Sequence, residues 1–284
     1  MTIDLVISYY KEDLGWLDKY KNKGINNIYI YNKGPNDIPD IKHPYIGIKM
    51  DNIGRCDHTY LYHIIHKYDV LADVTIFTTG SVDLPNKTEQ FDFIFNRTLA
   101  THDSVFHGYH YNDTVQAELY NFNISAYNSS DPKNNDRPQP MALSTIRPFG
   151  AWYESHFKNI NIHFVNFSGV FSVSKKHIHH HDVVYYQNLI TDFPNNSNPE
   201  VGHYFERAWV AIFHPIPKEC LNYKLGFTHP IPEERFNYTF WFFLYSIIVL
   251  LVIVCIFALY KFDIIKKTYI MRYIAKYFTT KYRT

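Results

Sequence analysis

The chain has 284 residues with 28 Lys/Arg and 27 Asp/Glu, which gives a net charge of +1. Residues 261–284 hold seven of the basic residues and one Asp, so the rest of the chain is mildly acidic and offers no electrostatic basis for nucleic-acid binding. The three cysteines exclude a disulfide framework and favour a reducing compartment.

The N-terminal part of the chain alternates short apolar or β-branched runs with helical patterns. An apolar stripe over residues 14–20 predicts a helix. A second predicted helix follows Arg55, and either Asp57 or Thr59 is expected to cap it. Its buried face is expected to contain Leu61, Ile64, Ile65 and Tyr68. Repetition of strand, helix and strand predicts a right-handed, mostly parallel α/β sheet with flanking helices. The predicted strands are residues 3–8, 27–31, 45–49 and 73–79.

The second half of the folded region has weaker patterns. Residues 121–140 are rich in Asn, Ser and Pro and are predicted to form a loop. Two short strands are expected at residues 162–167 and 169–174. The predicted helices are residues 91–101, 149–157, 174–181, 183–190 and 199–213. Together these elements predict one α/β domain over residues 1–213.

The C-terminal part of the chain predicts a membrane anchor. Residues 239–260 are 22 residues without a formal charge, long enough to cross a bilayer as a helix. A Pro-rich stalk is expected before them at residues 214–238, and a basic amphipathic tail after them at residues 261–284. The lipid bilayer is therefore an expected partner of this single-pass protein.

Two arguments about which side of the membrane the domain lies on oppose each other. The basic tail belongs in the cytosol by the positive-inside rule, which would place the domain outside. The N-terminus lacks a signal-peptide pattern, and with the few cysteines this favours a cytosolic domain. Potential N-glycosylation sequons do not decide the matter, because an Asn-rich chain contains many by chance. They begin at Asn86, Asn96, Asn112, Asn123, Asn128, Asn166, Asn195 and Asn237.

Polar side chains follow the predicted strands at their carboxyl ends, where open α/β sheets bind ligands. Tyr9, Lys11 and Glu12 follow the first strand and could contact a nucleotide, although acids at a helix start have the same pattern. Arg55 lies in an Asn-x-Gly-Arg turn and could pair with a phosphate or form a surface salt bridge. The other candidates at this edge are Asn32, Asn52, Ser81 and Asp83.

The last predicted helix supplies candidates for acid–base chemistry. Glu200, His203 and Glu206 lie off its apolar face, and a carboxylate or imidazole can deprotonate a hydroxyl. Acids at a helix start beside a surface pair are the alternative. The tract His177-Ile178-His179-His180-His181 could bind metal adventitiously, but its spacing predicts no metal site with fixed geometry.

Several motifs resemble those of a family of uncharacterised proteins, domain of unknown function 3431. They are V-I-S-Y-Y-K-E-D, I-Y-N-K-G, N-I-G-R-C-D-H, D-V-T-I-F-T-T-G-S, S-G-V-F-S-V-S and N-P-E-V-G-H-Y-F-E-R-A-W, within residues 3–213. Their layout is similar to that of GT-A glycosyltransferases, which have a Rossmann-like sheet and use nucleotide sugars. The resemblance implies a nucleotide-sugar donor and a glycan or other hydroxyl acceptor.

The resemblance also implies roles for individual residues. Tyr9, Glu12 and Asn32 would hold the nucleotide, and Gly169 would line the acceptor cleft. Arg55 with Ser81 would hold the diphosphate, and Glu200 or Glu206 would act as base. The chain departs from many GT-A enzymes where they carry Asp-x-Asp, because it has Gly80-Ser81-Val82-Asp83. One carboxylate is a poor site for a divalent cation. We therefore expect either a metal-independent transferase without a cofactor or a catalytically silent, membrane-anchored α/β module.

Overall fold

The computed structural model describes residues 1–20, 22–110, 113–127, 140–224, 261 and 266–272. The described helices are α1 (Arg55–Lys67), α2 (Pro85–Thr101), α3 (Asp113–Tyr120), α4 (Phe149–His156), α5 (Lys175–Ile178), α6 (Val183–Ile190) and α7 (Glu200–Ile212), with the 3₁₀ helices η1 (Gly15–Tyr20), η2 (Tyr68–Val70) and η4 (Lys218–Cys220).

The main sheet has five strands in the order β3-β2-β1-β4-β7. The first four are parallel, which confirms the predicted parallel α/β sheet, and β7 joins them antiparallel beside β4. The chain moves from β1 to β2 and β3 on one side, then returns to β4 on the other, so the strand order reverses between β1 and β4. The strands are β1 (Ile3–Tyr9), β2 (Asn27–Asn32), β3 (Ile46–Lys49), β4 (Val74–Thr79) and β7 (Phe171–Ser174).

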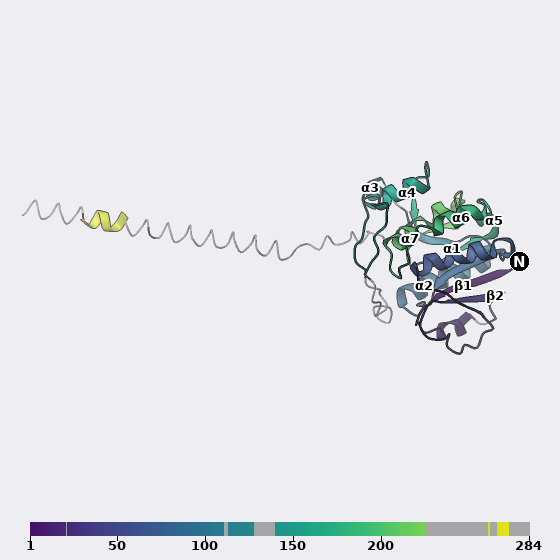
Figure 1. Ribbon diagram of the computed structural model, residues 1–284. Helices are drawn as coiled ribbons and strands as arrows, with labels where there is room; N and C mark the ends of the chain where they lie inside the picture. The colour runs from purple at the N-terminus through teal and green to yellow at the C-terminus, as the bar shows by residue number, and fades with distance from the viewer. Residues whose placement is uncertain (21, 111–112, 128–139, 225–260, 262–265, 273–284) are drawn as a thin grey trace, which may run out of the picture. The chain divides into compact units, whose positions relative to one another are not determined.

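Helices cover both faces of this sheet. Every residue of β1 is buried, as expected for a strand covered on both sides. Val6 packs in one core with residues of α1, α6 and α7, while its neighbours Leu5 and Ile7 pack in a second core with η1 and α2. Figure 1 shows α1, α6 and α7 on one side of β1 and β2, and η1 on the other.

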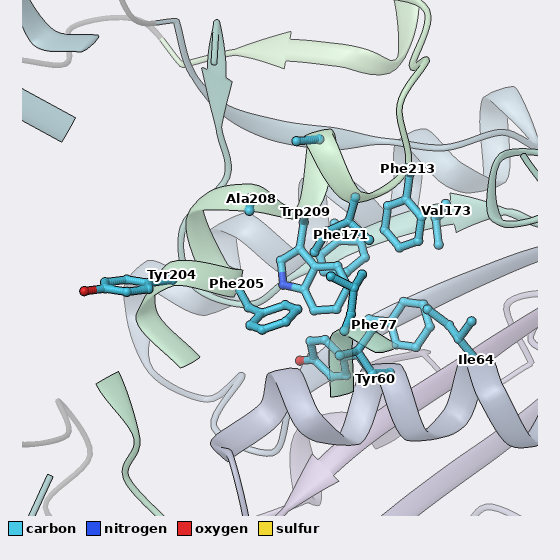
Figure 2. Close-up of a cluster of buried hydrophobic side chains, with 14 of the residues drawn as sticks. Tyr60, Ile64, Phe77, Phe171, Val173, Tyr204, Phe205, Ala208, Trp209 and Phe213 are labelled. Carbon is cyan, nitrogen blue, oxygen red and sulfur yellow. The ribbon is translucent and has the colours of Figure 1, made fainter. Parts of the chain in front are cut away.

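Aromatic side chains fill the first of these cores (Figure 2). The Trp209 ring of α7 lies 5.0 Å from Phe171 of β7 and 5.9 Å from Tyr60 of α1. Its Nε1 donates to Asp57 Oδ1 at 2.9 Å. These contacts join the last helix of the domain to its central helix and to the sheet.

A second, smaller sheet was not predicted from the sequence. It has the order β6-β5-β8, with β5 (Phe106–His110), β6 (Phe164–Val165) and β8 (Leu221–Tyr223). β6 lies within the strand predicted at residues 162–167, whereas β5 and β8 carry His, Gly or Asn and no apolar alternation marks them. Because β8 pairs with β5 and Cys220 is buried, residues 218–223 belong to the fold rather than to the predicted stalk. The compact unit extends from Met1 to Phe227.

Some local predictions are wrong. No side chain caps α1, which begins after Gly54. The Asp57 carboxylate is buried against Trp209, and the Thr59 hydroxyl lies 3.1 Å from Ser8 Oγ inside the domain. The stripe over residues 14–20 forms the 3₁₀ helix η1, and the predicted helix over residues 174–181 is shortened to α5. Ile65 and Tyr68 are only partly buried.

The predicted membrane span, residues 239–260, lies outside the described residues. Among the residues that the structure does describe, no helix is long and apolar enough to cross a bilayer. Of the predicted basic tail, residue 261 and residues 266–272 are described, and residues 266–272 form an exposed helical segment within a separate unit, Thr228–Thr284.

Candidate functional site

A polar pocket lies at the carboxyl edge of the main sheet, where the ends of β1 and β4 meet. Its volume is about 60 Å³. The pocket lies at the reversal of strand order, which is where open α/β sheets bind ligands. Its described lining consists of Ser8, Tyr9, Tyr10, Glu12, Lys33, Asn52, Arg55, Cys56, Thr79, Ser81 and Lys87. The structure therefore brings together five predicted site residues, Tyr9, Glu12, Asn52, Arg55 and Ser81.

Arg55 is held in a strained turn at the mouth of α1. The backbone φ angle of Arg55 is 54°, in the left-handed region that residues other than glycine rarely adopt. Gly54 before it has a φ angle of 65°. A Cβ on Gly54 would lie 2.4 Å from a ring carbon of Phe193, so only glycine fits there. The Arg55 guanidinium lies 4.4 Å from the Tyr127 ring and donates to Asn198 Oδ1 at 3.3 Å. The turn thus places one cation beside the first residues of α1.

Two lysines that the sequence analysis missed add to this positive charge. Lys33 Nζ donates to the backbone carbonyls of Ile53 and Arg55 and so supports the Arg55 turn. Lys87 Nζ donates to Ser81 Oγ at 2.7 Å, and burial lowers the pKa of Lys87. The sequence does contain a signal for Lys87. Proline is common as the first residue of a helix, so Pro85 predicts that a helix begins there and that Lys87 lies in its first turn, just after β4.

Glu12 shapes the loop after β1. Its Oε2 accepts the backbone N–H groups of Tyr10 at 2.6 Å and Lys11 at 3.0 Å. A Cβ on Gly80 would lie 2.8 Å from the same oxygen, so glycine at position 80 lets the loops after β1 and β4 approach closely. Burial, followed by the nearby Glu12 charge, raises the pKa of Tyr9.

Four of the predicted substrate-binding residues are not part of the pocket lining. Asn32 is buried and braces its own turn, accepting the Gly34 N–H at 2.9 Å. Lys11 Nζ lies 5.3 Å from the Tyr10 ring, and Asp83 is exposed. Gly169 is buried behind the pocket, where an added Cβ would lie 3.0 Å from the sulfur of Cys56, which does line the pocket.

Glu206 lies near this pocket on α7. Its Oε1 accepts the backbone N–H of Ser168 at 2.8 Å, and its side chain is 26% exposed. Its charge acts on Cys56 and Lys87 of the pocket and on the buried Asp57. Burial, with the Glu206 charge as the second cause, raises the pKa of Asp57 to about 7.

The raised pKa of Asp57 predicts a pH-dependent stability. Between about pH 4 and pH 7 the folded chain holds a proton on Asp57 that the unfolded chain releases, so the contribution of Asp57 to the free energy of unfolding falls as pH rises. Asp57→Asn keeps an oxygen for the Trp209 N–H without the charge. We expect this variant to gain stability relative to the wild type across that range, by up to a few kcal/mol, in urea denaturation at stepped pH. A stability difference independent of pH would contradict this assignment.

Glu200 has a different environment from Glu206, although both lie on α7. It is fully buried and accepts from the backbone N–H groups of Ile124 and Ser144, both at 2.9 Å, and from the Tyr204 hydroxyl at 2.8 Å. The Arg147 Nε lies 2.7 Å from its Oε2. Glu200 thus anchors the segments around residues 124 and 144 to the start of α7.

His203 is also buried, and its ring lies 4.6 Å from that of Tyr127. Burial, followed by the charges of Arg55 and Arg207, lowers the pKa of His203 well below its ordinary value. Its imidazole is therefore neutral near pH 7. Among the described residues, its Nε2 has no hydrogen-bond partner.

A larger cavity of about 590 Å³ shares no lining residue with the polar pocket. Its described lining includes Arg207 of α7 and His214, which follows that helix, together with His110, Phe164 and Tyr223 from the second sheet. No predicted site residue lies in this lining, so the cavity could not be predicted from the sequence motifs.

The fold and the pocket define an α/β protein with a cation-rich polar site at the reversal of strand order. The family described as "Protein of unknown function (DUF3431)" matches residues 5–228, and the chain belongs to that family. This confirms the family resemblance found in the sequence motifs. No curated protein matches the chain.

Proposed function

We propose that this protein transfers a sugar from a nucleotide-sugar donor to a hydroxyl acceptor while tethered to a membrane through residues 239–260. The observation that carries the proposal is the pocket at the junction of β1 and β4, with Lys33, Arg55 and Lys87 in its lining. The negatively charged diphosphate of a nucleotide would be attracted by these three positively charged side chains. The first turns of α1 and α2 add partial positive charge at the same place.

The donor would bind without a divalent cation. Such ions take several oxygen ligands, whereas Glu12 is the single carboxylate in the described lining and already accepts two backbone N–H groups. Arg55 and Lys87 would instead stabilise the charge that develops on the leaving diphosphate. Tyr9 and Asn52 would contact the parts of the donor nearer the pocket rim. The domain would face the cytosol.

Glu206 is the better of the two predicted bases. One of its oxygens is positioned by the Ser168 N–H, and its partly exposed carboxylate lies within electrostatic reach of Cys56 and Lys87. Glu200 has its oxygens occupied by four donors. We therefore propose that Glu206 deprotonates the acceptor hydroxyl and that Glu200 supports the fold.

Thermal-shift measurements on the full chain in detergent test donor binding. We expect a nucleoside diphosphate or nucleotide sugar to raise stability without Mn²⁺, by about 2.7 kcal/mol at 100 times its Kd. Arg55→Ala removes a charged hydrogen-bond donor and should weaken binding about 10- to 100-fold. Lys42→Ala, at an exposed ion pair with Asp18, is the matched control and should leave binding unchanged. A shift that requires Mn²⁺ would contradict metal-independent binding.

The second candidate function is a catalytically silent, membrane-anchored binding module. The small pocket favours it, because about 60 Å³ is well below the ~300–1,000 Å³ of typical small-molecule sites. In the enzyme, the enclosed part would hold only the phosphate end of the donor. Absence of a thermal shift with every nucleotide tested would select the silent module.

A further inference from the structure

A cluster of potential metal ligands lies away from the polar pocket, on the other end of the main sheet. It consists of Asp103, His177 and Cys220, each of which offers a ligand atom within 4.8 Å of the other two. Asp103 follows α2, His177 belongs to α5, and Cys220 ends η4. Three separate segments therefore bring an oxygen, a nitrogen and a sulfur to one place.

The surroundings of His177 hold its ring in position. The His177 side chain is 3% exposed, and its Nδ1 lies 2.6 Å from Ser104 Oγ and 2.9 Å from Ser174 Oγ. A metal-bound imidazole usually forms a hydrogen bond through its other ring nitrogen, which fixes the orientation of the ring, and the two hydroxyl groups can do this for His177. Cys220 is also buried and forms no disulfide, so its sulfur stays available as a thiol.

Asp103 retains ligand capacity despite its present contacts. Its Oδ2 accepts from Lys176 Nζ at 2.6 Å, and its Oδ1 accepts from the Ser104 N–H at 2.7 Å. The Ser174 side chain is a third hydrogen-bond partner, and because a carboxylate has about four lone-pair sites, these contacts leave one for a cation. The Lys176 side chain is 61% exposed and can turn toward solvent when a cation arrives.

Two of the other histidines of the tract are directed elsewhere, whereas the ring of His180 lies 5.3 Å from that of His177. His179 Nε2 lies 2.9 Å from the Tyr68 carbonyl oxygen, and its ring stacks on Tyr68. His181 Nε2 lies 3.2 Å from the carbonyl oxygen of His214. The tract is therefore not a simple run of exposed imidazoles, and His177 is the member that joins the Asp103 and Cys220 cluster.

We propose that Asp103, His177 and Cys220 form a zinc site that fastens the segment leading into β8 to the body of the domain. Zn²⁺ binds thiolate, imidazole and carboxylate ligands in proteins. Mg²⁺ and Ca²⁺ prefer oxygen ligands, so the sulfur of Cys220 disfavours them. As the zinc–sulfur bond forms, the thiol proton leaves to solvent. A water molecule completes four-coordination. This site is independent of the proposed sugar transfer.

Cobalt substitution of the full chain tests the site. After chelation and dialysis, Co²⁺ should bind at one ion per chain and produce a thiolate-to-cobalt charge-transfer band, and Zn²⁺ should displace it. Zn²⁺ should also raise the melting temperature of the chelated protein. Absence of the band in the wild-type chain would overturn the proposal without any variant.

Variants locate the ligands. Cys220→Ser should abolish the band, and His177→Gln should weaken Co²⁺ binding by more than about 100-fold. Cys56→Ser replaces the other described cysteine, and His179→Gln replaces a neighbouring histidine outside the cluster, so both should keep the wild-type spectrum. A band that survives in Cys220→Ser but disappears in Cys56→Ser would overturn the assignment, as would equal losses in His177→Gln and His179→Gln.

Discussion

Glu206→Gln is expected to slow sugar transfer by about 10²- to 10⁴-fold, the usual contribution of a positioned general base. The amide keeps an oxygen for the Ser168 N–H, so the variant should fold like the wild type. What it loses is the ability to accept a proton from the acceptor. Turnover of the nucleotide sugar that gives the strongest thermal shift is the measurement, with donor affinity determined on the same preparation.

Donor affinity separates this role from a binding role. A base acts after the donor is bound, so Glu206→Gln should keep the wild-type Kd for the nucleoside diphosphate while its kcat falls. Glu154→Gln, at an exposed position on α4, is the control for the loss of one surface carboxylate and should keep full turnover. Wild-type turnover in Glu206→Gln would remove Glu206 from the mechanism.

Glu200→Ala is expected to destabilise the domain by about 3–5 kcal/mol, the usual cost of removing one partner of a buried ion pair. The substitution leaves the Ile124 and Ser144 N–H groups and the Tyr204 hydroxyl without their acceptor, and Arg147 without its counter-charge. Buried donors that lose an acceptor carry a desolvation penalty. Urea denaturation followed by circular dichroism gives the free energy of unfolding directly.

The matched control for this prediction is Glu154→Ala. Its carboxylate is exposed, and surface substitutions of this kind change stability by about 0.5 kcal/mol or less. If Glu200→Ala instead unfolds at the wild-type urea concentration but has lost turnover, Glu200 rather than Glu206 is the base.

The main sheet could be predicted from the sequence because its strands are marked by local patterns. The four parallel strands β1 to β4 are each a short run of apolar or β-branched residues, and the predicted bounds agree with the observed ones within a residue or so at each end. The position of the pocket followed from the same pattern, since parallel strands end at one edge. In the second sheet only β6 falls within a predicted strand, at residues 162–167, whereas β5 and β8 have no such pattern and pair with segments far away in the chain.

The sequence by itself determined the parallel α/β core, the family and the edge of the sheet where polar residues gather, because these depend on residue types at regular short spacing. Only the tertiary structure separated Glu200 from Glu206, which have the same side chain on the same helix. It alone added Lys33 and Lys87 to the pocket and joined Cys220 to Asp103 and His177. Burial and hydrogen-bond partners determine what a charged side chain can do, and both come from segments distant in the sequence.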